Sequence, residues 1–225
     1  GAVYVFSRSG IEWTQQAYVK ASNTGRNDYF GSSVSLSSDG NTLAVGAPYE
    51  DSNARGINEN EDNDLTSAAG AVYVFSRSGI EWTQQAYVKA SNTEEIDSFG
   101  GSVSLSSDGN TLAVGAIGEG SNATGINENE GDNSAPFAGA VYVFSRSGIE
   151  WTQQAYVKAS NTNANDRFGD SVSLSSDGNT LAVGATDEKS NATGINEDPV
   201  DNSRLIGAGA VYVFSRSGTT WTQQA

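Results

Sequence analysis

The sequence of 225 residues contains no cysteine, no histidine and no methionine. Without cysteine the chain can form neither a disulfide bond nor a thiolate metal site. The absence of histidine removes the usual general base of enzymes and a common zinc ligand. No apolar run reaches the roughly 18 residues that a membrane-spanning helix needs. We therefore expect a protein that is not an enzyme and that does not insert into a membrane.

Basic residues are scarce as well: 12 lysines and arginines stand against 27 aspartates and glutamates, for a formal net charge of -15. This balance disfavours nucleic acid as a partner, because phosphates require lysine and arginine. Such acidity is typical of soluble extracellular proteins and of proteins that bind hard cations through oxygen. We expect an extracellular or cell-surface protein.

The chain has internal repetition in abundance. One segment recurs without change at intervals of 69 residues, as Gly1–Thr24, Gly70–Thr93 and Gly139–Thr162, and a truncated copy runs from Gly209 to Ala225. A second invariant block occupies Ser33–Ala47, Ser102–Ala116 and Ser171–Ala185. The chain starts inside an apolar stretch, which favours a segment of a longer protein.

Four strands are predicted in each unit. Val34 and Leu36 alternate with serines, the period-two pattern of a strand. Asp39-Gly40-Asn41 then predicts a tight turn, since glycine and asparagine tolerate positive φ. The first two strands carry small residues on one face, which allows close approach of a neighbouring sheet. The predicted strands, with the outer two given for their first copy, are Phe30–Ser37, Thr42–Ala47, Ala2–Phe6 and Trp13–Lys20.

The third strand is apolar on both faces, so both faces of its sheet must be covered. Blades stacked around an axis cover one another in this way. We therefore predict an all-β, β-propeller-like fold of tandem four-stranded antiparallel blades. Its divisions are an outer strand pair at 1–24 and blades at 25–93, 94–162 and 163–225. Three blades and a half do not suit a closed ring of four to eight blades, which favours self-association.

The spacing of short glycine motifs carries a resemblance to a known family. Phe30-Gly31, followed by Gly46-Ala47-Pro48 and then Gly70–Phe75, resembles the FG-GAP signature of integrin α-subunit propellers and their bacterial relatives. The resemblance implies a blade with Phe30–Ser37 innermost. Integrin-type repeats also carry an Asp-rich calcium loop between their first two strands. Here that place holds only Ser38–Asn41, so the family's calcium ligands are not carried over.

The candidate metal site is the long acidic segment between the second and third strands. Its copies share the core Ser-Asn-Ala-x-Gly-Ile-Asn-Glu, which predicts a defined turn with Ile57, Ile126 and Ile195 pointing inward. Calcium takes roughly six to eight oxygen ligands in flexible geometry. A solvated acidic loop is the alternative interpretation. The predicted Ca²⁺ ligands are Asn58, Glu59, Asp62, Asn127, Glu128, Asp132, Asn196, Glu197 and Asp201.

Two further sets of aspartates recur. Asp39, Asp108 and Asp177 are interpreted as turn residues. Asp28, Asp97 and Asp166 each precede Phe-Gly by two residues within variable segments, and there a backbone cap is favoured over a ligand.

Two functions remain open from the sequence. The first is an extracellular structural or adhesive repeat protein that self-associates through stacked blades, as a filament or surface array, with calcium in its acidic loops. The alternative is a closed β-propeller that recognises a carbohydrate or protein partner through its loops. Ring closure or linear assembly distinguishes the two.

Overall fold

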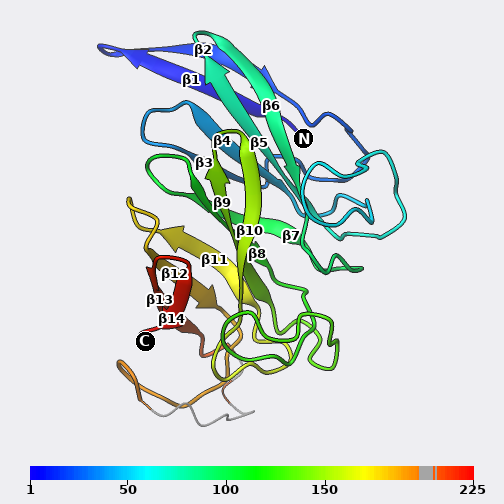
Figure 1. Cartoon of the computed structure of the whole chain (residues 1–225), viewed down its shortest axis with the longest axis vertical. Coiled ribbons are helices and arrows are strands. Elements are labelled where there is room, and N and C mark those ends of the chain that lie inside the picture. The colour runs from blue at the N-terminus through cyan, green and yellow to red at the C-terminus, as the bar shows by residue number, and fades with distance from the viewer. Residues whose placement is uncertain (198–204, 206) are drawn as a thin grey trace.

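The computed structural model describes residues 1–197, 205 and 207–225, and in them all regular structure is β (Figure 1). The outer hairpin at the start comprises β1 (Val3–Ser9) and β2 (Glu12–Val19). The next sheet comprises β3 (Ser33–Leu36), β4 (Thr42–Ala47), β5 (Ala71–Ser78) and β6 (Glu81–Val88). Then come β7 (Phe99–Leu105), β8 (Thr111–Ala116), β9 (Ala140–Ser147) and β10 (Glu150–Val157). The last sheet comprises β11 (Phe168–Leu174), β12 (Thr180–Ala185), β13 (Ala210–Ser217) and β14 (Thr220–Gln223).

These strands form one two-stranded and three four-stranded sheets, and in each of them the spatial order of the strands follows the chain. All pairings within the sheets are antiparallel. The sheets succeed one another along the long axis, with the β1–β2 hairpin at one end and the β11–β14 sheet at the other (Figure 1). The predicted all-β fold of tandem blades is confirmed. No helix in the described residues has the length and apolarity to cross a bilayer.

Strand ends differ from the prediction in two places. The first strand of a unit begins at Phe99 and Phe168 in the later units but at Ser33 in the first. In the second unit Phe99 N–H donates to Ala69 O (3.0 Å) and Gly70 bridges to Phe99, which extends the first strand forward to Phe99. The outer hairpins also have tighter turns than predicted, because β1 runs on to Ser9 and β2 starts at Glu12.

The apolar core lies between successive blades. We call the face of a sheet toward the preceding unit its leading face, and the face toward the following unit its trailing face. Val72 and Val74, on the trailing face of the β3–β6 sheet, pack against the leading face of the β7–β10 sheet. There Phe99 contacts Tyr142 edge-on, with ring centroids 5.4 Å apart. Each blade therefore covers its neighbour, as the two-sided apolar strands predict.

Asp39 closes the turn between β3 and β4. Its Oδ1 accepts hydrogen bonds from Ser37 Oγ (2.6 Å) and from Asn41 N–H (2.9 Å). These bonds hold the pKa of the Asp39 carboxyl below its ordinary value. Asp108 and Asp177 repeat the arrangement, so the prediction that these aspartates are turn residues is confirmed.

Candidate functional site: buried ion pairs and the open ends of the stack

A buried ion pair joins the loop after the second strand to the end of the outer strand. Lys89 Nζ lies 2.8 Å from Glu50 Oε2, and both side chains are at most 2% exposed. In the next unit Lys158 Nζ lies 2.7 Å from Glu119 Oε2, with equal burial. Burial lowers the pKa of both lysines. In each pair the ammonium and the carboxylate have lost their hydrating water, and the direct contact between the two charges takes its place.

An asparagine connects each carboxylate to the preceding unit. Asn23 Nδ2 donates to Glu50 Oε1 at 3.0 Å, and Tyr73 Oη donates to Asn23 Oδ1. Burial raises the pKa of Tyr73, so its hydroxyl stays protonated as a donor. Asn92 and Asn161 repeat these contacts in the later units. The segment at the end of each outer strand therefore contacts its own blade through its lysine and the next blade through its asparagine.

Sequence reasoning missed these pairs, although a signal was present. Glu50, Glu119 and Glu188 stand at the same place after Gly-Ala in every unit, while the two residues between them and Gly-Ala change each time. An invariant residue within a variable stretch indicates a specific contact.

The acidic loop folds back against the outer strand of its own blade. Asn58 N–H donates to Tyr87 O (2.8 Å), and Tyr87 N–H donates to Asn58 Oδ1 (2.9 Å). Asn127 makes the same two bonds with Tyr156. The predicted inward placement of Ile57 and Ile126 is confirmed, since they pair with Val88 and Val157 of the outer strands. Ile195, by contrast, is 80% exposed.

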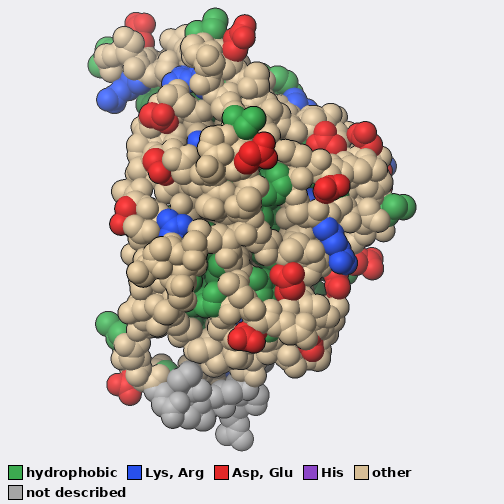
Figure 2. Space-filling view, viewed as in Figure 1, with side chains coloured by type: hydrophobic (Ala, Val, Ile, Leu, Met, Phe, Trp, Pro, Cys, Tyr) green, Lys and Arg blue, Asp and Glu red, His purple; other side chains and the backbone are tan. Residues whose placement is uncertain are grey.

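In the first unit the predicted ligands Asn58, Glu59 and Asp62 line one hollow of about 330 Å³, together with Asn60 and Glu61. Glu59, Asp62, Glu128, Asn196 and Glu197 are exposed, and Asp132 accepts hydrogen bonds from Ser134. Asp201 lies outside the described residues. Acidic side chains are spread over the face shown in Figure 2, with fewer basic ones. In the described part of the chain no three histidine, cysteine, aspartate or glutamate side chains group closely enough to hold a metal ion. Calcium binding by these residues stays a prediction.

Asp97 caps the loop before Phe-Gly. Its Oδ2 accepts a hydrogen bond from Glu94 N–H (2.8 Å), and Asp28 and Asp166 make the equivalent bond, which confirms the cap interpretation. Asp97 is only 3% exposed, and this burial, with the nearby charge of Glu119, raises its pKa to about 7.

This raised pKa predicts a stability that falls as the pH rises. The fold favours the protonated Asp97, so its contribution is complete below the ordinary pKa of 3.8 and is lost as the pH approaches 7. In Asp97→Asn the amide oxygen still accepts the Glu94 N–H but carries no charge. We expect the free energy of unfolding of the variant to exceed that of the unchanged protein by on the order of 2 kcal/mol between about pH 5 and 7, as measured by denaturant unfolding. Asp132→Asn, at a carboxyl whose pKa is lowered, should show no such gain.

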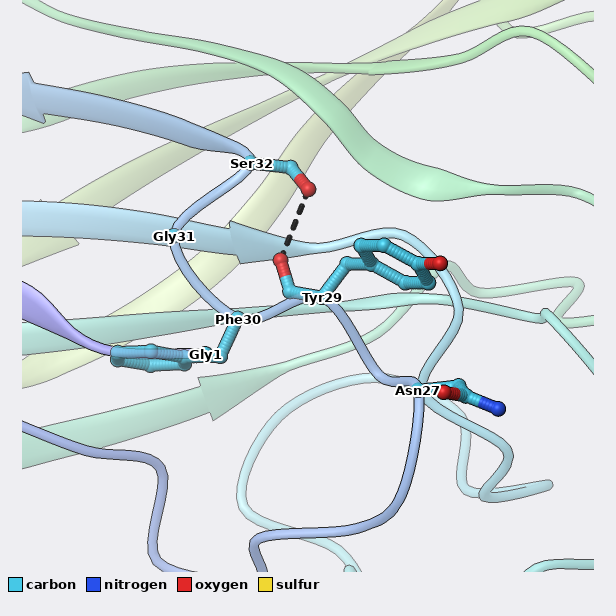
Figure 3. A pocket seen from close by; sticks show the side chains of 6 residues that line it. All are labelled: Gly1, Asn27, Tyr29, Phe30, Gly31 and Ser32. Carbon is cyan, nitrogen blue, oxygen red and sulfur yellow. Dashed lines mark hydrogen bonds between the residues drawn. The ribbon is translucent and has the colours of Figure 1, made fainter.

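The first end of the stack leaves apolar side chains exposed. A hollow of about 420 Å³ lies beside Gly1, Tyr29 and Phe30 (Figure 3). On β3, Val34 is 53% and Leu36 50% exposed.

The last end of the stack exposes the opposite face. Val211 of β13 is 66% exposed, whereas its counterparts Val72 and Val141 are fully buried under the next blade. Val213 and Ala182 are likewise more open than their buried counterparts in the earlier units. The last end therefore exposes the trailing face that is buried twice inside the molecule, and the first end exposes the part of the leading face that the β1–β2 hairpin does not cover.

A comparison with family models agrees with the predicted resemblance. The family model for the FG-GAP repeat matches three segments, residues 13–75, 82–144 and 151–214. No curated protein matches the sequence. The crystal structure of Saccharomyces cerevisiae Sqt1 is similar at a TM-score of 0.45 and 10% identity, covering 88% of this chain and 35% of that one. A hypothetical selenium-binding protein from Sulfolobus tokodaii is similar at 0.42 and 10% identity, covering 85% and 39%. The chain spans less than half the length of both.

Proposed function

The chain belongs to the FG-GAP repeat family, and we propose that it is an extracellular structural repeat module that assembles end to end through its blades. In this assembly the trailing face of the last blade of one copy joins the leading side of the first blade of the next. The contact is heterologous, so repeated addition builds a filament or array rather than a symmetric dimer.

One observation carries the proposal: each open end exposes residues that are buried at the equivalent place inside. At one end Leu36 is half exposed, where Leu105 is 7% exposed. At the other end Val211 is 66% exposed, where its counterparts Val72 and Val141 are fully buried. Burying apolar surface stabilises an association by roughly 25 cal/mol for each Å². The contact between two copies can follow the geometry of the contacts between blades, because the strands on its two sides repeat the sequences of the strands inside the molecule.

Acidic loops and the location outside the cell belong to the same proposal. The net charge of -15 keeps single copies soluble and apart at low ionic strength. Salt screens this repulsion over about 10 Å at 0.1 M, so assembly should strengthen as salt is added. Calcium bound in the acidic loops would also strengthen assembly, because it would neutralise part of their negative charge.

The first test is the mass of the protein in solution. Sedimentation velocity or light scattering at rising concentration is expected to show a series of growing species rather than one particle. Val211→Arg places a charge on the open trailing face and should weaken association at least about tenfold, because an unpaired buried charge is costly. Ile149→Arg is the matched control, since Ile149 is exposed at the tip of the β9–β10 hairpin, away from both faces.

The outcomes separate the candidate functions. A single closed particle at every concentration contradicts end-to-end assembly and favours a ring that binds a carbohydrate or protein partner through its loops. Equal weakening by the two arginine variants would also contradict the proposal, because it would reflect charge in general and not the open face.

A further inference from the structure

A buried carboxylate in the second blade contacts an asparagine as well as a lysine. Glu119 Oε2 lies 2.7 Å from Lys158 Nζ, and Glu119 Oε1 accepts a hydrogen bond from Asn92 Nδ2 at 3.4 Å. The exposed fractions are 0% for Lys158, 1% for Glu119 and 8% for Asn92. One carboxylate therefore holds an amine on one oxygen and a carboxamide on the other, in a place from which water is largely excluded.

The carbonyl oxygen of this asparagine has a donor of its own. Tyr142 Oη donates to Asn92 Oδ1, and burial raises the pKa of Tyr142, so that the hydroxyl stays protonated. Asn92 Nδ2 also donates to Glu130 O at 2.7 Å, which fixes the other end of the amide. A hydrogen bond at a carbonyl oxygen stabilises the negative charge that develops there when a nucleophile attacks the carbon.

The first blade contains the same arrangement. Lys89 Nζ lies 2.8 Å from Glu50 Oε2, and Asn23 Nδ2 donates to Glu50 Oε1 at 3.0 Å. Tyr73 Oη donates to Asn23 Oδ1. The chain therefore has two complete sites of lysine, glutamate, asparagine and tyrosine, and each draws its asparagine from the preceding unit.

We propose that each site forms an isopeptide bond with release of ammonia, joining Lys158 Nζ to Asn92 Cγ and Lys89 Nζ to Asn23 Cγ. In this self-catalysed modification the glutamate carries protons and the tyrosine hydroxyl holds the carbonyl oxygen. The inference does not depend on the proposed assembly, because all the reacting groups belong to one chain.

The reaction starts from the ion pair. Burial lowers the pKa of Lys158, so its ammonium can give one proton to Glu119 Oε2 and become a neutral amine. The Nζ lone pair attacks Asn92 Cγ, and the carbonyl electrons move to Oδ1, beside the Tyr142 hydroxyl. The carboxylic acid gives its proton to Nδ2 and takes one from Nζ. The bond between Cγ and Nδ2 then breaks, the carbonyl re-forms, and ammonia leaves.

The step balances without a further reactant. An ammonium, a carboxylate and a primary amide become a secondary amide, a carboxylic acid and ammonia. Neutral groups thereby replace two opposite charges in the interior, which removes the cost of keeping those charges away from water. The ion pair is the state of the chain before the reaction, and it is the reference state for the stability of variants at Lys158.

The two bonds follow one line along the stack. Lys89 and Asn92 belong to one segment after β6, which is therefore linked to the preceding unit through Asn23 and to the following unit through Lys158. Covalent bonds, and not only packing between blades, would then carry a pull along this line. A cross-link also stabilises a fold by restricting the unfolded chain, a role that disulfides cannot fill in a chain without cysteine.

The mass of the full, unfolded chain tests the inference. The unchanged protein should be lighter than its sequence by two molecules of ammonia, one for each site. Ammonia is also lost when an asparagine side chain closes on its own backbone, so the mass alone does not identify the bond. Proteolytic digestion followed by mass spectrometry should therefore yield two branched peptides, one joining Asn92 to Lys158 and one joining Asn23 to Lys89.

Variants at the second site use the first site as an internal control for folding. Lys158→Met and Glu119→Gln should each lose one molecule of ammonia and keep only the branched peptide of Asn23 and Lys89. Lys20→Met is the matched control, because Lys20 has the same sequence neighbours but is exposed, and it should form both bonds.

The rate of bond formation tests the role of the tyrosine hydroxyl. In chains made by cell-free translation and sampled over time, Tyr142→Phe should form the bond between Asn92 and Lys158 at least about tenfold more slowly than the unchanged protein. The bond between Asn23 and Lys89, which uses Tyr73, should form at an unchanged rate.

Three results would overturn the inference. The first is a chain that keeps the full mass of its sequence after prolonged incubation, and the second is a loss of ammonia without branched peptides. The third is a bond between Asn92 and Lys158 that forms equally fast in Glu119→Gln, because the carboxylate would then not be the proton carrier. A branched peptide at one site alone overturns the inference for the other site.

Discussion

Replacing Lys158 with methionine is expected to lower the free energy of unfolding by about 3–5 kcal/mol, because it leaves the buried Glu119 carboxylate without its cation. Both side chains are at most 1% exposed, so water cannot replace the lost ammonium. The remaining donors to Glu119 are the Ser121 N–H at 3.1 Å and Asn92 Nδ2 at 3.4 Å. Neither donor carries a charge. Denaturant unfolding followed by tryptophan fluorescence measures the loss.

Two further variants assign the loss to the unpaired charge. Lys158→Met combined with Glu119→Leu should recover most of the stability, since a well-packed apolar pair can replace a buried ion pair. Lys20→Met is the matched control, because Lys20 has the same sequence neighbours but is exposed. It should change stability by less than about 0.5 kcal/mol. Equal losses for Lys158→Met and Lys20→Met would contradict the ion-pair argument.

The fold could be predicted because its determinants are local and repeated. The alternation around Val34 and the two-sided apolar third strand follow from residues close in sequence, and each pattern recurs in every unit. The Asp39 turn was equally accessible, since its hydrogen bonds join residues two apart. Even the need for close approach of neighbouring sheets could be inferred from the small residues of the second strand.

The candidate site was harder to predict because its contacts are not local. Glu50 and Lys89 lie 39 residues apart, and charged side chains are usually exposed, so each alone indicates a surface residue. Asn58 suggested a calcium ligand because an amide oxygen beside carboxylates suits that ion. Its hydrogen bonds to Tyr87 depend on a loop that folds back across the blade, which no local pattern encodes.

Replacing Gly115 with alanine is expected to cost about 3 kcal/mol of stability, because the added methyl group has no room between two blades. A Cβ on Gly115 would lie 2.0 Å from the carbonyl oxygen of Gly169 in the next blade and 2.4 Å from Ser102 Oγ. Ser102 Oγ also donates to that carbonyl at 2.7 Å, so the contact that ties the blades would be disrupted. A lower melting temperature and a lower denaturant midpoint are the expected measurements.

Gly184→Ala is the control that isolates the neighbouring blade as the cause. Gly184 lies in the same Thr-Leu-Ala-Val-Gly-Ala sequence, but its added Cβ would crowd only the Ser171 side chain, at 2.5 Å for Oγ. Because Ser171 can rotate away, the loss should stay below about 1 kcal/mol. Equal losses at the two glycines would place the strain within a blade instead of between blades. If a second copy stacks on this end, Gly184→Ala should spare the single copy and still prevent assembly, since the methyl group then meets the incoming blade as it does at Gly115.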